Sequence, residues 1–190
     1  MGITHFNFAH MTKRTLFTAA FLMTTVAMSV INYIDHRKSS ATRSKLMQIS
    51  DGVFITSQLH PNSLHYLKRR GIRTVVDIRP DGEDAEQPPS TEIEHAAKAE
   101  ALSFYYIPVP HETIPDSAVD SLSAAMKDSR MPTVLYCRTG RRAVRLFALA
   151  EVARVDGPAA DSIKLMMEKA GFSADDLQET IAKRINSRAK

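Results

Sequence analysis

Short runs of apolar and β-branched residues alternate with stretches of helical periodicity over most of the chain after residue 48. Four of these runs have the length and composition of strands: residues 53–56, 74–78, 104–109 and 133–136. Between them, apolar residues recur at helical spacing, as in Val119, Leu122 and Met126. Parallel strands need a crossover that a helix commonly supplies. The alternation therefore predicts an α/β fold, a central, mainly parallel sheet flanked by helices.

Capping and turn signals place the boundaries between these elements. Thr91 stands where the N-cap of a helix is expected, with Glu94 three residues later as its capping-box partner. Residues 79–89 and 110–115 are polar and are predicted to be loops. In an open parallel sheet, ligands bind beyond the carboxyl ends of the strands, so these loops are the first places to look for a site.

A run of uncharged residues, 15–34, precedes the alternating part and is long enough for one membrane-spanning helix. Basic residues flank it on both sides: Lys13, Arg14, Arg37 and Lys38. We predict a single-pass membrane anchor, with residues 1–14 as a short tail and 35–48 as a polar, basic linker. A cleaved signal sequence is the alternative. The flanking charges nearly balance, so they do not assign the side of the membrane that the domain at 49–190 faces.

The distribution of charge argues against nucleic-acid binding. The net charge is +4, but residues 1–45 hold six basic residues and one acidic residue, which leaves the remainder slightly acidic. The single cysteine excludes an intrachain disulfide and a cysteine-rich zinc site. The histidines show no paired spacing, so we expect no metal and no cofactor.

That single cysteine, Cys137, directly follows the predicted strand 133–136, and a helical pattern begins just beyond Gly140. Backbone N–H groups and the positive end of a helix dipole both favour a thiolate and an oxyanion bound above it. Gly140 permits the tight turn, and Arg142 supplies a planar fork for two anion oxygens. We expect a nucleophile in an anion-binding loop, which also contains Arg138, Thr139, Gly140 and Arg141. A buried structural cysteine is the alternative.

Residues 49–182 resemble the phosphatase-like domain of beta-lactamase-hydrolase-like proteins. The matching segments occur in the family's order: residues 51–53, 57–58, 71–83, 87–89, 107–109 and 136–142. The resemblance implies a phosphatase-like catalytic domain at 49–190 with the fold of dual-specificity and tyrosine phosphatases. It also implies that Cys137 attacks phosphorus, that Arg142 holds the phosphoryl oxygens, and that an acid on another loop protonates the leaving group.

The cysteine loop departs from the usual phosphatase pattern in two ways. Tyr136 stands where histidine is usual, and Arg142 lies one position early, with Ala143 in the expected place of the arginine. A loop of this shorter spacing is similar to that of rhodanese sulfurtransferases. Three functions therefore stay open: a phosphatase with a phosphocysteine, a sulfurtransferase that carries a persulfide on Cys137, and an inactive anion-binding module. The expected partner is a phosphorylated or sulfane-sulfur small molecule or protein.

Residues outside the cysteine loop complete the candidate site. His111 and Glu112 stand near the place of the phosphatase general acid, and solvated loop residues are the alternative for both. Asp77 and Arg79, at the end of a central strand, are expected either to orient the cysteine loop or to form a structural salt bridge. The acidic cluster that follows is predicted to be a solvated loop without metal: Asp81, Glu83, Asp84 and Glu86.

Overall fold

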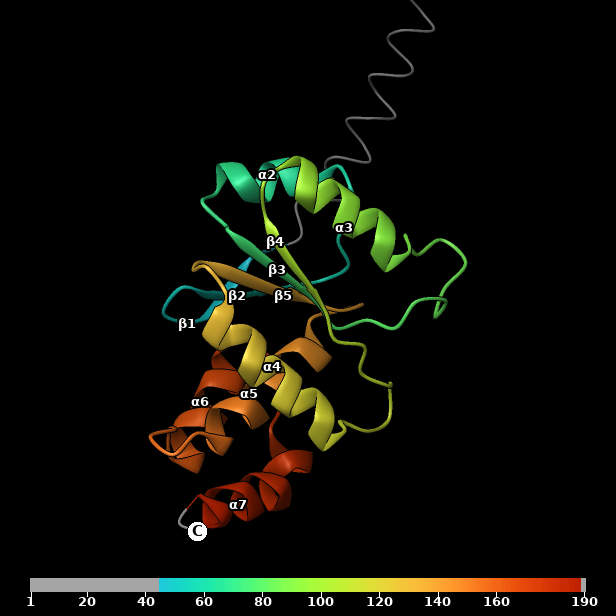
Figure 1. Ribbon diagram of the computed structural model, residues 1–190. Helices are drawn as coiled ribbons and strands as arrows, with labels where there is room; N and C mark the ends of the chain where they lie inside the picture. The colour runs from blue at the N-terminus through green and yellow to red at the C-terminus, as the bar shows by residue number, and fades with distance from the viewer. Residues whose placement is uncertain (1–44, 189–190) are drawn as a thin grey trace, which may run out of the picture. The chain divides into compact units, whose positions relative to one another are not determined.

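A computed structural model describes residues 45–188 of the chain (Figure 1). The predicted tail at 1–14, the predicted anchor at 15–34 and residues 35–44 of the predicted linker lie outside these residues. Within residues 45–188, no helix combines the length and apolar character that a bilayer crossing requires.

The core of the fold is a five-stranded sheet with the order β1-β2-β5-β3-β4. Its strands are β1 (Met47–Ser50), β2 (Val53–Thr56), β3 (Thr74–Asp77), β4 (Ser103–Tyr106) and β5 (Thr133–Tyr136). β2, β5, β3 and β4 run parallel, and only β1 is antiparallel to its neighbour. The prediction of a mainly parallel sheet flanked by helices is confirmed. The antiparallel edge strand β1 was not predicted, since Met47–Ser50 is half exposed and lacks a run of β-branched residues.

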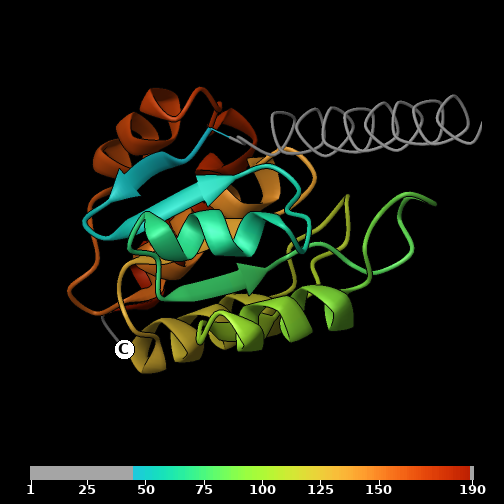
Figure 2. The same ribbon diagram turned by 90° about the horizontal axis from the view of Figure 1, so that it is seen from above.

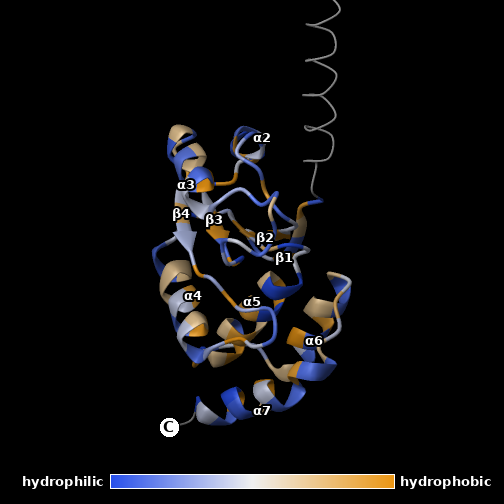
Figure 3. Cartoon of the chain, turned by 90° about the vertical axis from the view of Figure 1, so that its right-hand side faces the viewer, coloured by the Kyte–Doolittle hydropathy of each residue, from blue (hydrophilic) through white to orange (hydrophobic). Residues whose placement is uncertain are grey.

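Helices cover both faces of this sheet (Figure 1, Figure 2). One face carries α2 (Ser63–Arg69) and α3 (Ser90–Ala99), and the other carries α4 (Asp116–Asp128), α5 (Arg141–Ala153), α6 (Ala160–Lys169) and α7 (Gln178–Ser187), the last preceded by the 3₁₀ turn η2 (Asp175–Leu177). The helices contain both hydrophobic and hydrophilic residues (Figure 3), and most of their buried residues are hydrophobic.

The side chains of the central strands alternate between two hydrophobic clusters, as the two-residue period of a strand requires. Val134 and Tyr136 of β5 join the cluster under α2 and α3, whereas Leu135 and Cys137 join the larger cluster under α4 and α5. All four residues of β3 and of β5 are buried. Because β5 is buried on both faces, its end is held firmly in the sheet. Cys137, the next residue, is therefore held in place as well.

The loop between β3 and α3 is tied down at its base. Helix α3 begins at Ser90, so the expectation of an N-cap at Thr91 is wrong, because Thr91 lies inside the first turn. The carboxylate of Asp81 instead accepts hydrogen bonds from the Ser90 N–H (2.7 Å) and the Ser90 hydroxyl (2.7 Å). The Gln87 side-chain amide also donates to the Pro80 carbonyl (2.9 Å). A polar loop is thereby held at the same edge of the sheet as Cys137.

The segment between β4 and α4 begins at that edge too. β4 ends at Tyr106, earlier than the predicted 104–109, but the N–H groups of Ile107 and Val109 still donate to the carbonyls of Asp77 (2.8 Å) and Ile78 (3.0 Å). The chain therefore follows β3 past its end before it turns away toward α4.

Candidate active site

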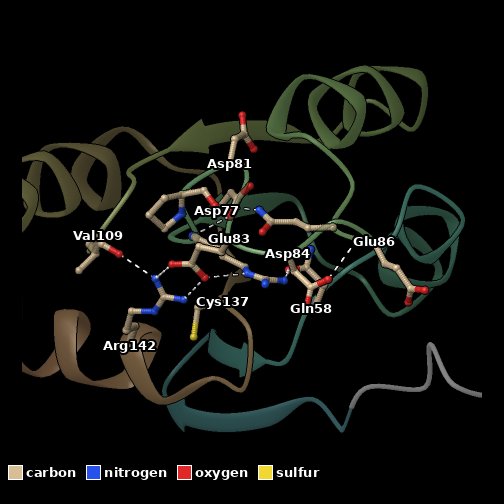
Figure 4. Close-up of polar contacts among 12 residues, drawn as sticks. Gln58, Asp77, Asp81, Glu83, Asp84, Glu86, Val109, Cys137 and Arg142 are labelled. Carbon is tan, nitrogen blue, oxygen red and sulfur yellow. Dashed lines mark hydrogen bonds and ion pairs between the residues drawn. The ribbon is translucent and has the colours of Figure 1, made fainter. Parts of the chain in front are cut away.

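Cys137 is the first residue after β5 and is only 1% exposed. The last residues of the two neighbouring strands, Thr56 of β2 and Asp77 of β3, are both paired with Tyr136. Three strand ends and the loops that follow them thus meet beside the thiol (Figure 4). This is the edge at which a parallel sheet is expected to bind its ligand.

The turn from β5 into α5 is built around Gly140. Its φ of 91° lies in the left-handed region, where glycine carries no Cβ penalty. This conformation turns the Gly140 N–H toward the thiol, and the N–H donates to Cys137 Sγ at 3.2 Å. The Gln58 N–H donates to the Arg138 carbonyl (3.3 Å) and fixes the outer part of the turn. The loop therefore presents a backbone donor to the sulfur.

The side chains of Arg138, Thr139 and Arg141 are exposed, in contrast to those of Cys137 and Arg142. Arg141 Nη2 lies 3.7 Å from a carboxylate oxygen of Asp176 in η2. These three predicted loop residues are on the surface of the turn, whereas Gly140 and Arg142 lie at the sulfur.

Arg142 is the second residue of α5, and its side chain is 8% exposed. Its Nη1 donates to the Val109 carbonyl at 2.8 Å, which ties the guanidinium to the segment after β4. Burial opposes the charge, but hydrogen bonds to Glu83 and the nearby Cys137 sulfur outweigh burial and raise the pKa of Arg142. The sequence-predicted nucleophile and anion-binding arginine are thus adjacent.

Glu83 is the residue that sequence reasoning missed. Its Oε1 and Oε2 accept from Arg142 Nη1 (2.5 Å) and Nη2 (2.7 Å), and Oε2 also accepts from Arg79 Nε (2.9 Å). The hydrogen bond from Arg142 is the main cause that lowers the pKa of Glu83, and Arg79 lowers it further. The expectation that Glu83 is simply solvated is wrong. A usable signal was its position in the loop that follows β3, whose end lies beside that of β5.

Arg79 is held from several directions. Its backbone N–H donates to Asp77 Oδ1 (2.9 Å) and its Nη1 to Gln58 Oε1 (2.7 Å), and its side chain is 4% exposed. Burial raises the pKa of the neighbouring Asp77 to about 6. Burial and the nearby Asp77 also raise the pKa of Tyr136. Asp77 and Arg79 therefore form a buried polar layer behind Glu83.

The two candidates for the general acid are not brought to the sulfur. His111 and Glu112 are exposed, in the segment between β4 and α4. The same segment does reach the site through the Val109 carbonyl on Arg142 (2.8 Å). The structure thus anchors the beginning of the loop at the site, with both side chains facing solvent.

In residues 45–188, no three His, Cys, Asp or Glu side chains are grouped so that they could hold a metal ion. A cavity of about 780 Å³ lies at the opposite edge of the sheet, where Asp51 precedes β2 and Met131 precedes β5. This cavity is remote from Cys137, so the candidate chemistry is located by the buried side chains rather than by the cavity.

Comparison with known proteins places this site in a family. Residues 45–154 match the family model described as the phosphatase-like domain of beta-lactamase hydrolase-like protein. Curated relatives of that name occur in Xylella fastidiosa strain Temecula1, 29% identical over 113 residues, and in Agrobacterium fabrum, 29% identical over 107 residues. These matches cover 60% and 56% of this chain. The chain spans about a quarter of each relative, 26% and 25% of their lengths.

Solved structures with the same fold include phosphatases and candidate phosphatases. A candidate phosphatase from Neisseria meningitidis Z2491 superposes with a TM-score of 0.64 at 24% identity, covering 73% of this chain and 97% of the other. TpbA from P. aeruginosa, in complex with pTyr, gives a TM-score of 0.55 at 16% identity, covering 78% and 93%. These likenesses show the fold. With more than half of its length matched by the family model, the chain belongs to the family of the phosphatase-like domain of beta-lactamase hydrolase-like proteins.

Proposed function

We propose that the chain is a cysteine-dependent phosphatase that hydrolyses phosphate esters of a small molecule or a protein through a phosphocysteine at Cys137. The observation that carries this proposal is the convergence of a backbone donor and a guanidinium on one sulfur. The Gly140 N–H lies 3.2 Å from Sγ, and the buried Arg142 lies beside it. The membership of a phosphatase-like family supports the same assignment.

The reaction has two displacements at phosphorus. In the first, the Cys137 thiolate forms an S–P bond while the bond from phosphorus to the ester oxygen breaks, and that oxygen takes a proton from an acid. In the second, water attacks phosphorus, the S–P bond breaks, and the thiolate is released with inorganic phosphate. Arg142 and the loop amides hold the non-bridging oxygens through both steps.

The proton for the leaving group comes from the segment between β4 and α4 in this proposal. Glu83 is close to the sulfur, but Arg142 lowers its pKa and so keeps it ionised, which disqualifies it as a proton donor. Glu112 and His111 follow Val109, whose carbonyl is bonded to Arg142. We assign the acid to Glu112, with His111 as the alternative, and closure of this segment over the substrate brings it to the leaving oxygen.

An aryl phosphate assay on the full chain in mild detergent tests the nucleophile and the arginine. We expect Cys137→Ser to lower turnover by about a thousandfold or more, because it removes the covalent route. Arg142→Lys should lower it by about a hundredfold, because lysine cannot form the bidentate contact. Arg154→Lys is the matched control, since Arg154 is the C-cap of the same helix and pairs with Glu151 and Asp156. Turnover that survives Cys137→Ser would contradict the proposal.

A series of leaving groups tests the acid. Glu112→Gln should slow esters of weakly acidic alcohols by roughly 10²–10⁴-fold and p-nitrophenyl phosphate much less, because a good leaving group needs no proton. His111→Asn provides the comparison. Equal losses for all leaving groups would remove Glu112 from the role of acid.

A parallel assay with thiosulfate and cyanide addresses sulfur chemistry at the same residue. The proposal predicts no Cys137-dependent formation of thiocyanate. Sulfur transfer without phosphate release would replace the phosphatase by a sulfurtransferase, and inactivity with both donors would leave an anion-binding module.

We also propose that residues 15–34 anchor the domain to a membrane as a single-pass segment. The uncharged run and its flanking basic residues support this location. Carbonate extraction of membranes from cells that express the full chain tests it. Retention in the membrane pellet is expected, and release into the supernatant would contradict an anchor.

A further inference from the structure

Two buried guanidinium groups converge on one carboxylate beside Cys137. Glu83 Oε2 accepts from both Arg142 Nη2 (2.7 Å) and Arg79 Nε (2.9 Å), while Oε1 accepts from Arg142 Nη1 (2.5 Å) (Figure 4). A carboxylate with its two oxygens satisfied by a guanidinium fork imitates two oxygens of a phosphoryl group. The N–H groups that an anion at the sulfur would need are therefore already occupied from within the chain.

The two arginines are fixed independently of Glu83. Arg79 also donates to Gln58 Oε1 (2.7 Å), and Arg142 also donates to the Val109 carbonyl (2.8 Å). Their side chains are 4% and 8% exposed, whereas that of Glu83 is 22% exposed. The guanidinium groups are thus part of the packed interior. The carboxylate comes in from the outer side on a loop.

Apart from the contacts of Glu83 itself, the loop that carries it is held at its base. Asp81 is bonded to Ser90, and the Asp81 N–H donates to the Tyr106 hydroxyl (3.0 Å). Gly82 has a φ of 79°, and a Cβ built there would meet nothing within 4 Å. The space beside Gly82, next to Glu83, is therefore open, and in the inference drawn below Glu83 withdraws while the base of the loop and helix α3 stay in place.

The charges at this point favour exchange of one anion for another. Two guanidinium groups face the Glu83 carboxylate, with the Cys137 sulfur and the Asp77 carboxyl group close by, so much of their positive charge is balanced while Glu83 is bound. A phosphoryl dianion added without displacement would share its donors with a carboxylate and meet uncompensated negative charge. Removal of Glu83 frees three N–H groups on two side chains for the oxygens of the incoming anion.

We propose that Arg79 and Arg142 together form a two-guanidinium binding site for the dianionic phosphoryl group of the substrate, and that Glu83 occupies this site until substrate displaces it. This inference rests on the proposed phosphatase function and adds Arg79 as a substrate-binding residue. A carboxylate that only positions Arg142 is the competing role for Glu83, and the two roles predict opposite effects of its removal.

Calorimetric titration of the full chain with inorganic phosphate at pH 7.5 tests the site. Glu83→Gln should bind phosphate about tenfold more tightly than the unaltered chain, because the internal competitor loses its charge and one acceptor oxygen. When Arg79→Met is added to Glu83→Gln, the affinity for phosphate should fall about tenfold relative to Glu83→Gln alone. Arg154→Met is the control, because it removes an arginine that pairs with Glu151 and Asp156 rather than with Glu83.

Weaker phosphate binding by Glu83→Gln would overturn the proposal and assign the carboxylate to positioning Arg142. Equal affinities with and without Arg79 would remove Arg79 from the site. Arg79→Lys, which keeps the charge and the aliphatic stem, replaces Arg79→Met if thermal unfolding shows that the methionine variant does not fold, and the same loss of affinity is expected. Phosphate binding does not require turnover. If the affinities change as predicted but the protein shows no phosphatase activity, only the proposed function is refuted. If the protein has Cys137-dependent phosphatase activity but the variants bind phosphate as tightly as the unaltered chain, only the two-guanidinium inference is refuted.

Discussion

The pKa values of two carboxyl groups, one on either side of Arg79, are shifted in opposite directions by their surroundings. Asp77 is 2% exposed, and burial raises its pKa to about 6. Glu83 faces the guanidinium of Arg142, which lowers its pKa. Desolvation disfavours the charged form, and an opposite charge favours it. Near neutral pH the Glu83 carboxylate is therefore ionised, while Asp77 gains or loses its proton near pH 6.

The raised pKa of Asp77 makes a prediction about stability against pH. Stability from neutral Asp77 is complete below its ordinary pKa of 3.8 and is lost as pH rises through about 6. Asp77→Asn cannot ionise and keeps an oxygen for the Arg79 N–H. Relative to the unaltered chain, it should therefore gain about 2 kcal/mol between pH 4.5 and pH 7.5. Denaturant unfolding at both pH values measures this. An equal difference at both values would contradict the assignment.

At this scale, the sequence predicted the residues of the cysteine turn and the strand-end residues Asp77 and Arg79, but it missed Glu83. Cys137, Gly140 and Arg142 belong to one turn, so their proximity follows from local geometry alone. Glu83 is 59 positions from Arg142, in a run of acidic residues whose composition is that of a solvated loop. Only the register of β3 beside β5 brings the two together, and register is a property of the folded sheet.

At the scale of elements, the cysteine turn works because its glycine has a backbone conformation that other residues resist. Gly140 (φ 91°) directs an N–H at the sulfur, and α5 begins immediately after it with Arg141. The sequence predicted this strand–turn–helix unit because Thr133–Tyr136 and the helical pattern after Gly140 are both strong. It did not predict that Asp81, nine residues before Ser90 in the loop that leads into α3, supplies the contacts at the start of that helix, because this contact lies outside the sequence spacing of a capping box.

Gly140→Ala and Gly71→Ala separate the two consequences of a left-handed glycine. Both have positive φ, and neither has a neighbour closer than ordinary van der Waals distance to an added Cβ. Each substitution should destabilise the protein by about 1–2 kcal/mol through strain. Only Gly140→Ala should also lower aryl phosphate turnover, by about tenfold or more. Strain at this position moves the backbone N–H that donates to the sulfur. Equal turnover in both variants, measured below their unfolding temperatures, would remove the Gly140 N–H from the site.

At the scale of the whole molecule, the family match ends at residue 154, yet the hydrophobic core continues beyond it. Ile163 and Met167 of α6 and Ile181 of α7 are buried in the same cluster as Leu135 and Cys137. The Arg188 guanidinium also donates to the carbonyls of Gly157 (2.9 Å) and Pro158 (2.8 Å). The two C-terminal helices are therefore part of the layer that supports α5 and the cysteine turn.

This shared core predicts one cooperative unfolding transition. Ile181→Ala should destabilise the whole domain by about 2–5 kcal/mol, because it leaves a cavity under α7. Leu165→Ala in α6 is the matched control, since Leu165 is 51% exposed and should change stability by less than about 0.5 kcal/mol. Circular dichroism and a fluorescent probe on the cysteine turn should report the same transition. Separate transitions for the two probes would show that the C-terminal helices fold apart from the site.

The central claim is that phosphorus is transferred to the sulfur of Cys137. Rapid mixing of the full chain with an aryl phosphate, acid quenching within the first turnovers and mass spectrometry of the peptide that contains Cys137 test it most directly. The account predicts that this peptide gains the mass of one phosphoryl group, and that Arg142→Lys lowers the fraction labelled. Aryl phosphate hydrolysis without a phosphoryl adduct on Cys137 would contradict the claim.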